Sequence, residues 1–80
     1  MSNGMRPVHP GEVLREDYLT PLNMSDSHFA NETGIPIEDV TGILAGQRAV
    51  TTDIAARLAK TLGTSPEFWL NLQKRFELRR

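Results

Sequence analysis

The chain has no cysteine and no long apolar run. Without cysteine it can form no disulfide, thiolate metal site or cysteine nucleophile, and a reducing, cytoplasmic location is expected. The longest apolar run is three residues, far short of the roughly 20 needed to cross a membrane. The sequence therefore predicts neither a membrane span nor a signal-peptide core.

Residues that would mark an enzyme are also missing. The two histidines, His9 and His28, have no paired ligand spacing, and no phosphate-binding glycine loop or nucleophile elbow occurs. Glu16-Asp17 and Glu38-Asp39 are adjacent acids, which point to different sides of a helix. We expect no enzymatic activity, no metal and no cofactor.

Eighty residues make one domain, which buries only about 60% of its extended surface. Such a chain needs well-packed helices or a partner subunit for stability. We expect a mobile tail at residues 1–5, or a cloning remnant, and a single domain over residues 6–80.

Charge is unevenly distributed along the chain, although the net charge is only −1. Residues 1–45 carry two basic and seven acidic residues, whereas residues 46–80 carry seven basic and three acidic ones. An anionic partner is therefore expected to prefer the second half.

Glycine, proline and capping residues divide the chain into five expected helices, and no segment alternates with the period of a strand. The predicted helices begin near Pro10, Asp26, Pro36, the Thr51–Thr52 pair and Pro66, and the first four end at Pro21, Gly34, Gly46 and Gly63. The fold class predicted is all-α.

Residues 25–45 have the spacing of a helix-turn-helix. Ala30 permits close approach of two helices, Gly34 permits a positive φ in the turn, and Val40 and Ile43 hold the second helix down. The outer face of that helix is then free to enter a major groove. An ordinary αα-hairpin in a small bundle remains the alternative from spacing alone.

Three motifs resemble those of HigA-family antitoxins: HPGEVLRE at 9–16, AGQR at 45–48 and TSPEFWLNLQ at 64–73. The similarity extends over about residues 6–78. It implies a five-helix, lambda-repressor-like fold of the XRE class. It also implies a homodimer that binds a palindromic operator in its own promoter and neutralises a HigB toxin, an mRNA-cleaving enzyme similar to RelE.

The resemblance also assigns DNA-binding positions. Those that read bases are Pro36, Ile37, Glu38, Thr41 and Gly42, and those that anchor phosphates are Ser25 to Ser27, Gln47, Arg48, Thr51 and Thr52. Ile37 suits a thymine methyl group, Glu38 a cytosine amino group, and Thr41 either kind of edge. Backbone N–H groups at helix starts bind phosphates.

Three carboxylates, Asp26, Glu38 and Asp39, stand where relatives usually carry neutral or basic groups. In one interpretation they oppose DNA binding. In the other they are first-turn acids that stabilise their own helices by about 0.3–1 kcal/mol each. Because Arg48 is the one cation clearly placed on this face, few phosphate contacts per protomer are expected.

The apolar last helix, about residues 65–78, is the predicted dimerisation element. Its candidate interface residues are Trp69, Leu70, Leu72, Gln73, Phe76 and Leu78. Trp69, Phe68, Leu72 and Phe76 are expected to face one way, mainly into the core. Leu70 and Leu78 lie off that stripe and are the main interface candidates, although Leu70 alternatively covers the first helix. A two-fold dimer places two recognition helices about 34 Å apart.

The predicted function is a HigA-like antitoxin and autorepressor whose partners are double-stranded operator DNA and a HigB/RelE-like toxin. The alternatives are a stand-alone or prophage XRE regulator, and a toxin-binding module without useful DNA affinity. The toxin-contact residues are not predictable from the sequence. An acidic docking surface that includes Glu16, Asp17 and Glu32 is one hypothesis for a basic toxin.

Overall fold

A computed structural model describes residues 7–79, and this part of the chain is built of helices without any strand. In chain order the elements are α1 Pro10–Val13, η1 Leu14–Leu19, α2 Thr20–Leu22, α3 Asp26–Thr33, α4 Ile37–Leu44, α5 Thr52–Leu62 and α6 Pro66–Arg79. The all-α prediction is confirmed. The predicted tail at 1–5 lies outside the described residues.

The first helical stretch, α1 through η1 to α2, does not stop at Pro21. It continues to Leu22, and Asn23 then takes the left-handed conformation with φ 55°. In η1 the helix widens, so that the N–H of Thr20 bonds to the carbonyl of Arg15, five residues back. Proline lacks an N–H and clashes with the carbonyl four residues earlier in a regular α-helix. A widened turn is a known way to accommodate such a residue.

The capping predictions hold for the later helices. The Ser25 hydroxyl accepts a hydrogen bond from the His28 N–H at 3.1 Å, and Thr51 accepts one from the Ile54 N–H at 3.3 Å. Gly34 and Gly63 end α3 and α5 with φ of 75° and 72°. Two boundaries shift by a residue or two, because Pro36 is the cap before α4 and α4 ends at Leu44, before Gly46.

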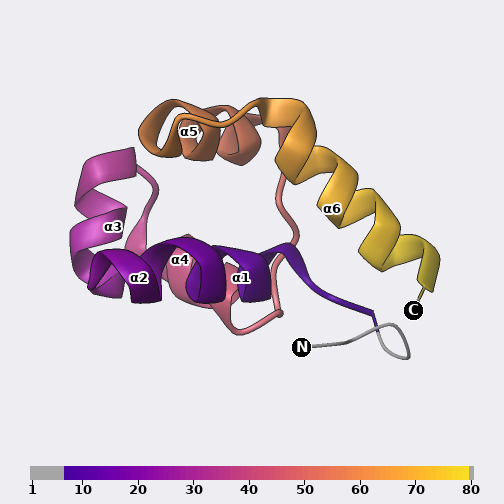
Figure 1. Cartoon of the computed structure of the whole chain (residues 1–80), viewed down its shortest axis with the longest axis horizontal. Helices are drawn as coiled ribbons and strands as arrows, with labels where there is room; N and C mark the ends of the chain where they lie inside the picture. The colour runs from indigo at the N-terminus through magenta and orange to yellow at the C-terminus, as the bar shows by residue number, and fades with distance from the viewer. Residues whose placement is uncertain (1–6, 80) are drawn as a thin grey trace.

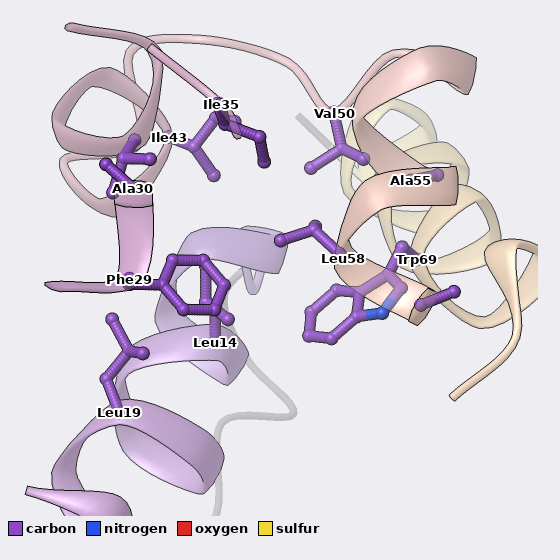
Figure 2. Packing of buried hydrophobic residues seen from close by; sticks show 12 residues of the cluster. Leu14, Leu19, Phe29, Ala30, Ile35, Ile43, Val50, Ala55, Leu58 and Trp69 are labelled. Atoms are coloured by element: carbon purple, nitrogen blue, oxygen red, sulfur yellow. The ribbon is translucent and has the colours of Figure 1, made fainter. Parts of the chain in front are cut away.

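The core lies between the helices: α5 packs against α3 and α6, α1 packs against α4 and α6, and α3 packs against α4 (Figure 1). The Phe29 and Trp69 side chains are completely buried, and Leu14 and Leu58 pack beside them (Figure 2). The indole N–H of Trp69 donates to the Thr64 hydroxyl at 2.8 Å. A satisfied polar atom lets this large ring stay inside without an orphaned donor.

Helix α6 does not bury the whole of its predicted apolar stripe. Trp69 and Gln73 are buried and Leu72 and Phe76 partly so, whereas Phe68 is 38% exposed. Phe68 lies at the edge of the indole, with ring centroids 5.0 Å apart. The prediction that Phe68 shares the inward face is therefore wrong. The buried face of α6 contains Trp69 and Gln73, which are four residues apart.

Candidate DNA-binding surface

The turn between α3 and α4 has the helix-turn-helix geometry that the spacing predicts. Gly34 has φ 75°, and its N–H donates to the Ala30 carbonyl at 2.9 Å. Ala30, Val40 and Ile43 are all buried. Thr33 tightens the corner, because its hydroxyl accepts from the Ile35 N–H at 3.1 Å and donates to the Phe29 carbonyl at 2.9 Å. The packing therefore holds one face of α4 inward and leaves the other outside.

The base-reading positions gather on the outer face of α4. Pro36, Ile37, Glu38 and Thr41 are exposed, whereas Gly42 is half-buried. The Thr41 hydroxyl donates to the Glu38 carbonyl at 3.2 Å, which leaves its lone pairs free to accept from a base edge. An exposed apolar side chain such as Ile37, at 40%, suits contact with a thymine methyl group.

The predicted phosphate-anchoring positions lie at the starts of α3 and α5 and, for Gln47 and Arg48, in the loop after α4. The Ser25 and Thr51 hydroxyls are used as the caps of α3 and α5, so the remaining first-turn N–H groups are the donors available to a phosphate. Ser27, Gln47 and Thr52 are exposed.

Arg48 lies in the loop after α4, but its side chain returns to that helix. Its guanidinium forms an ion pair with Asp39. A Cβ at Gly42 would lie 2.6 Å from the Arg48 Cδ and 2.7 Å from its Cγ, so the arginine stem occupies the space over that glycine. The sequence did not predict this pairing, because no local pattern links two residues nine positions apart.

Two of the three carboxylates near this face have arginine partners. Asp26 lies 3.6 Å from Arg15, and Asp39 pairs with Arg48. Within residues 7–79, Glu38 has no ion pair. The carboxylates are therefore not equivalent, since only Glu38 presents an uncompensated charge beside the base-reading positions.

No family model matches the chain, but individual relatives do. Antitoxin HigA-1 of Vibrio cholerae is 36% identical over 73 residues, an alignment that covers 91% of this chain and 69% of that protein. A HigA-family antidote protein from Coxiella burnetii has a solved structure that matches with a TM-score of 0.88 and 50% identity, over 92% of this chain and 80% of that one.

The chain belongs to the HigA antitoxin family. A structure of Pseudomonas aeruginosa HigA with the higBA promoter also matches, with a TM-score of 0.89 and 37% identity over 91% of this chain and 79% of that one. The relatives named are antitoxins and helix-turn-helix regulators. The five-helix, lambda-repressor-like fold that the motifs implied is confirmed.

In this HigA-family chain α1 supports α4 from behind. A Cβ at Gly11 would lie 1.8 Å from the Ile43 carbonyl oxygen, so the two backbones are in direct contact. His9 caps α1, because its Nδ1 accepts from the Gly11 N–H at 2.9 Å. Burial lowers the pKa of His9, and its hydrogen bond with the Arg48 backbone partly opposes that shift.

The predicted dimer residues divide between the inside and the outside of one chain. Trp69 is fully buried and Gln73 is 7% exposed, so neither offers much surface to a second copy. Leu70, Leu72 and Phe76 are partly buried, and Leu78 is 76% exposed. In the single chain Leu70 belongs with the partly buried residues that pack on the core.

Residues 7–79 contain no group of three or more histidine or acidic side chains placed to hold a metal ion. No helix among them is both long and apolar enough to cross a membrane.

Proposed function

We propose that this HigA-family chain binds operator DNA as a homodimer through α4 and represses its own operon. The observation that carries the proposal is that residues 36–38 and 41, at the start and on the outer face of α4, are exposed. The match to a HigA solved with promoter DNA supports it. Occupying an operator in the promoter blocks transcription from it.

Equilibrium binding to DNA upstream of its own gene tests the repressor. Fluorescence anisotropy at two salt concentrations compares that duplex with a scrambled duplex of equal length. Arg48→Glu is expected to weaken binding to both duplexes strongly, because Arg48 is a phosphate-anchoring position. Lys60→Glu is the matched control, because it makes the same charge change near the far end of α5, eight residues and about 12 Å along the helix from Thr52. Equal binding of both duplexes by the unmodified chain would contradict operator recognition.

The homodimer is proposed to form through α6. Leu78 is the most exposed large apolar residue described, and Phe68 on the same helix is also open. A second copy that covers both removes apolar surface from water. Sedimentation equilibrium is expected to give a dimer, and Leu78→Asp is expected to give a folded monomer with weakened operator binding. Leu22→Asp, which changes another exposed leucine, is the control for a nonspecific effect of the charge.

The second proposed activity is neutralisation of a HigB/RelE-like toxin. The family membership supports it, and the toxin is expected from a neighbouring reading frame with a basic composition. Glu16, Asp17 and Glu32 are exposed acids that suit a basic partner. Co-expression is expected to relieve toxicity, and charge reversal at all three is expected to weaken the purified complex. Unchanged affinity would exclude this docking surface without excluding neutralisation elsewhere.

A stand-alone XRE regulator is the second candidate. The relatives named only as helix-turn-helix transcriptional regulators favour it. It predicts operator binding with no toxin gene beside it and no relief of toxicity on co-expression. A chain that relieves toxicity but shows no DNA preference would instead be the protein-binding module.

A further inference from the structure

The loop residue Arg48 lies along the recognition helix. Its aliphatic stem crosses α4 at Gly42, the one position of that helix without a side chain to block it, and its guanidinium reaches Asp39. Gly42 and Asp39 therefore lie one turn apart on α4 and both contact the same loop arginine. Gly42 leaves room for the Arg48 stem, and Asp39 holds the Arg48 guanidinium.

We propose that Asp39 is a positioning residue that holds the Arg48 guanidinium across Gly42 for contact with a DNA phosphate. The proposal rests on the operator binding proposed above. It assigns Asp39 a supporting role in DNA binding, in contrast to the repulsion expected from the charge of a carboxylate on this face.

The chemistry of the guanidinium permits both contacts. Arginine presents five N–H donors in a planar fork, and the hydrogen bond to Asp39 comes from Nη1. The other donors remain for phosphate oxygens. Holding the long side chain in one place before DNA arrives reduces the conformational entropy lost on binding.

The surroundings favour a phosphate at this place. Arg48 and Asp39 line an open hollow of about 350 Å³ together with Thr51 and Asp53 at the start of α5, and the Asp53 carboxylate is paired with Arg57. The first-turn N–H groups of α5 carry the partial positive charge of a helix start. Between residues 25 and 52 the sequence contains no other lysine or arginine. The nearby Arg15 and Arg57 pair with Asp26 and Asp53, so Arg48 is the cation that the helix-turn-helix segment itself supplies.

Two matched substitutions separate positioning from repulsion. Asp39→Ala and Glu38→Ala each remove one carboxylate from the first turn of α4, but only Asp39 touches Arg48. Losing one ionic contact at 0.1 M salt weakens binding by about eightfold, from a slope of about −0.9 in log K against log salt, and a homodimer loses two such contacts. We expect Asp39→Ala to weaken binding by about three- to eightfold per protomer, which is about ten- to sixtyfold for the dimer, and Glu38→Ala to tighten it by about twofold.

The same two changes in an Arg48→Ala background provide the decisive readout. Without the arginine Asp39 has nothing to position, so Asp39→Ala is expected to tighten binding as Glu38→Ala does. A loss of stability cannot produce that reversal of sign. The salt slope of Asp39→Ala is also expected to approach that of Arg48→Ala, and thermal melting checks that every variant is folded.

Gly42→Ala tests whether the Arg48 stem needs the open space over residue 42. The added Cβ displaces the arginine stem, whereas alanine is the better helix former by about 1 kcal/mol. Binding is expected to weaken about threefold or more while the melting temperature holds or rises. In the Arg48→Ala background the same change is expected to weaken binding less, because no arginine stem remains to be displaced.

The outcomes keep the two proposals apart. If the unmodified chain does not prefer its upstream duplex, the operator proposal fails before any variant is compared. If it does and Asp39→Ala tightens binding, Asp39 is a repulsive charge and the positioning role is overturned. Phosphate contact requires the upstream and scrambled duplexes to weaken alike. A loss confined to the upstream duplex would overturn the phosphate assignment in favour of base contact.

Discussion

Two glycines show at the residue scale how a missing side chain shapes the DNA-binding surface. At Gly11 the space is filled by backbone, the Ile43 carbonyl of α4. At Gly42 it is filled by a flexible side chain, the stem of Arg48. Backbone in a packed core cannot move aside cheaply, whereas an exposed side chain can rotate away. The two positions therefore differ in what a methyl group costs.

Gly11→Ala is expected to destabilise the chain by about 3 kcal/mol or more, since an overlap with backbone exceeds ordinary overpacking. For a domain of this size that lowers the melting temperature by at least about 10 °C. Gly42→Ala is the matched control, and its melting temperature is expected to hold or rise. Thermal unfolding followed by circular dichroism at equal protein concentration measures both. Similar losses in the two variants would contradict the distinction.

His9 connects the start of α1 to two other parts of the molecule. Its Nδ1 caps α1, its ring lies edge-on to Phe76 of α6 at 4.8 Å, and it bonds to the Arg48 backbone. Burial is the larger cause of its lowered pKa. The folded chain therefore prefers the neutral ring, and protonation removes the lone pair that accepts from the Gly11 N–H.

Stability is expected to fall as the pH drops below the unfolded pKa of about 6.5. In that range the unfolded chain takes up a proton that the folded chain refuses, and the loss ends once the pH passes the lowered folded pKa. His9→Asn retains a capping side chain without the titration, so urea unfolding between pH 7 and pH 5 should show a smaller decline. His28→Gln, at an exposed position, is the control. An identical decline in His9→Asn and the unmodified chain would exclude His9 as the cause.

At the scale of elements, the sequence predicted helices best where punctuation is local. Ser25, Gly34 and Pro66 act on neighbouring N–H or carbonyl groups, so α3 and the start of α6 match their predicted bounds. The prediction that the first helix ends at Pro21 is wrong. Proline destabilises a regular α-helix through the turn that precedes it, and η1 widens that turn. Leu14 and Leu19, five residues apart, are both 1% exposed, a spacing that fits this widened helix rather than a regular α-helix.

The candidate site was predictable as a set of positions but not as a set of contacts. The resemblance assigned positions 36–38 and 41 to a face that the structure leaves exposed. The pairing of Arg48 with Asp39 depends on how a loop folds back, and the role of Gly11 depends on how two helices cross. Neither follows from local sequence.

Helix α6 is joined to the loop that carries Arg48 through one side chain. The Gln73 Oε1 accepts from the buried Val50 N–H at 2.8 Å, and its Nε2 donates to Glu77 at 3.0 Å. Gln73→Met keeps the length of the side chain but leaves a buried N–H without an acceptor. Unfolding is expected to become easier by about 1–3 kcal/mol.

Urea titration measures this loss, and Asn71→Leu serves as a control because it makes a similar amide-to-apolar change at an exposed position of α6. Amide hydrogen exchange at Val50 supplies a second readout, since its protection should fall more than that of residues in α3. Equal stability of Gln73→Met and the unmodified chain would show that the loop is held by other contacts.

At the scale of the whole molecule, the fold places the basic residues of α6 away from α3. The helix-turn-helix lies within the acidic half of the sequence, and the basic residues Lys74, Arg75 and Arg79 lie on α6. Figure 1 shows α3 and α6 at opposite ends of the described chain. The positive charge on α6 therefore lies away from α3, and we expect α6 to contribute little long-range attraction at that end of the DNA-binding surface.

Binding to the upstream duplex is accordingly expected to depend only weakly on salt. One ionic contact through Arg48 in each protomer of a dimer gives a slope of about −2 in log K against log salt. Lys60→Glu should leave that slope nearly unchanged, while Arg48→Ala should bring it close to zero. Anisotropy titrations at several salt concentrations measure all three. A slope steeper than about −5 would require more phosphate contacts than Arg48 supplies. The additional contacts would then come from Arg15 or Arg57, which lie beside the helix-turn-helix, from α6 or from residues outside 7–79.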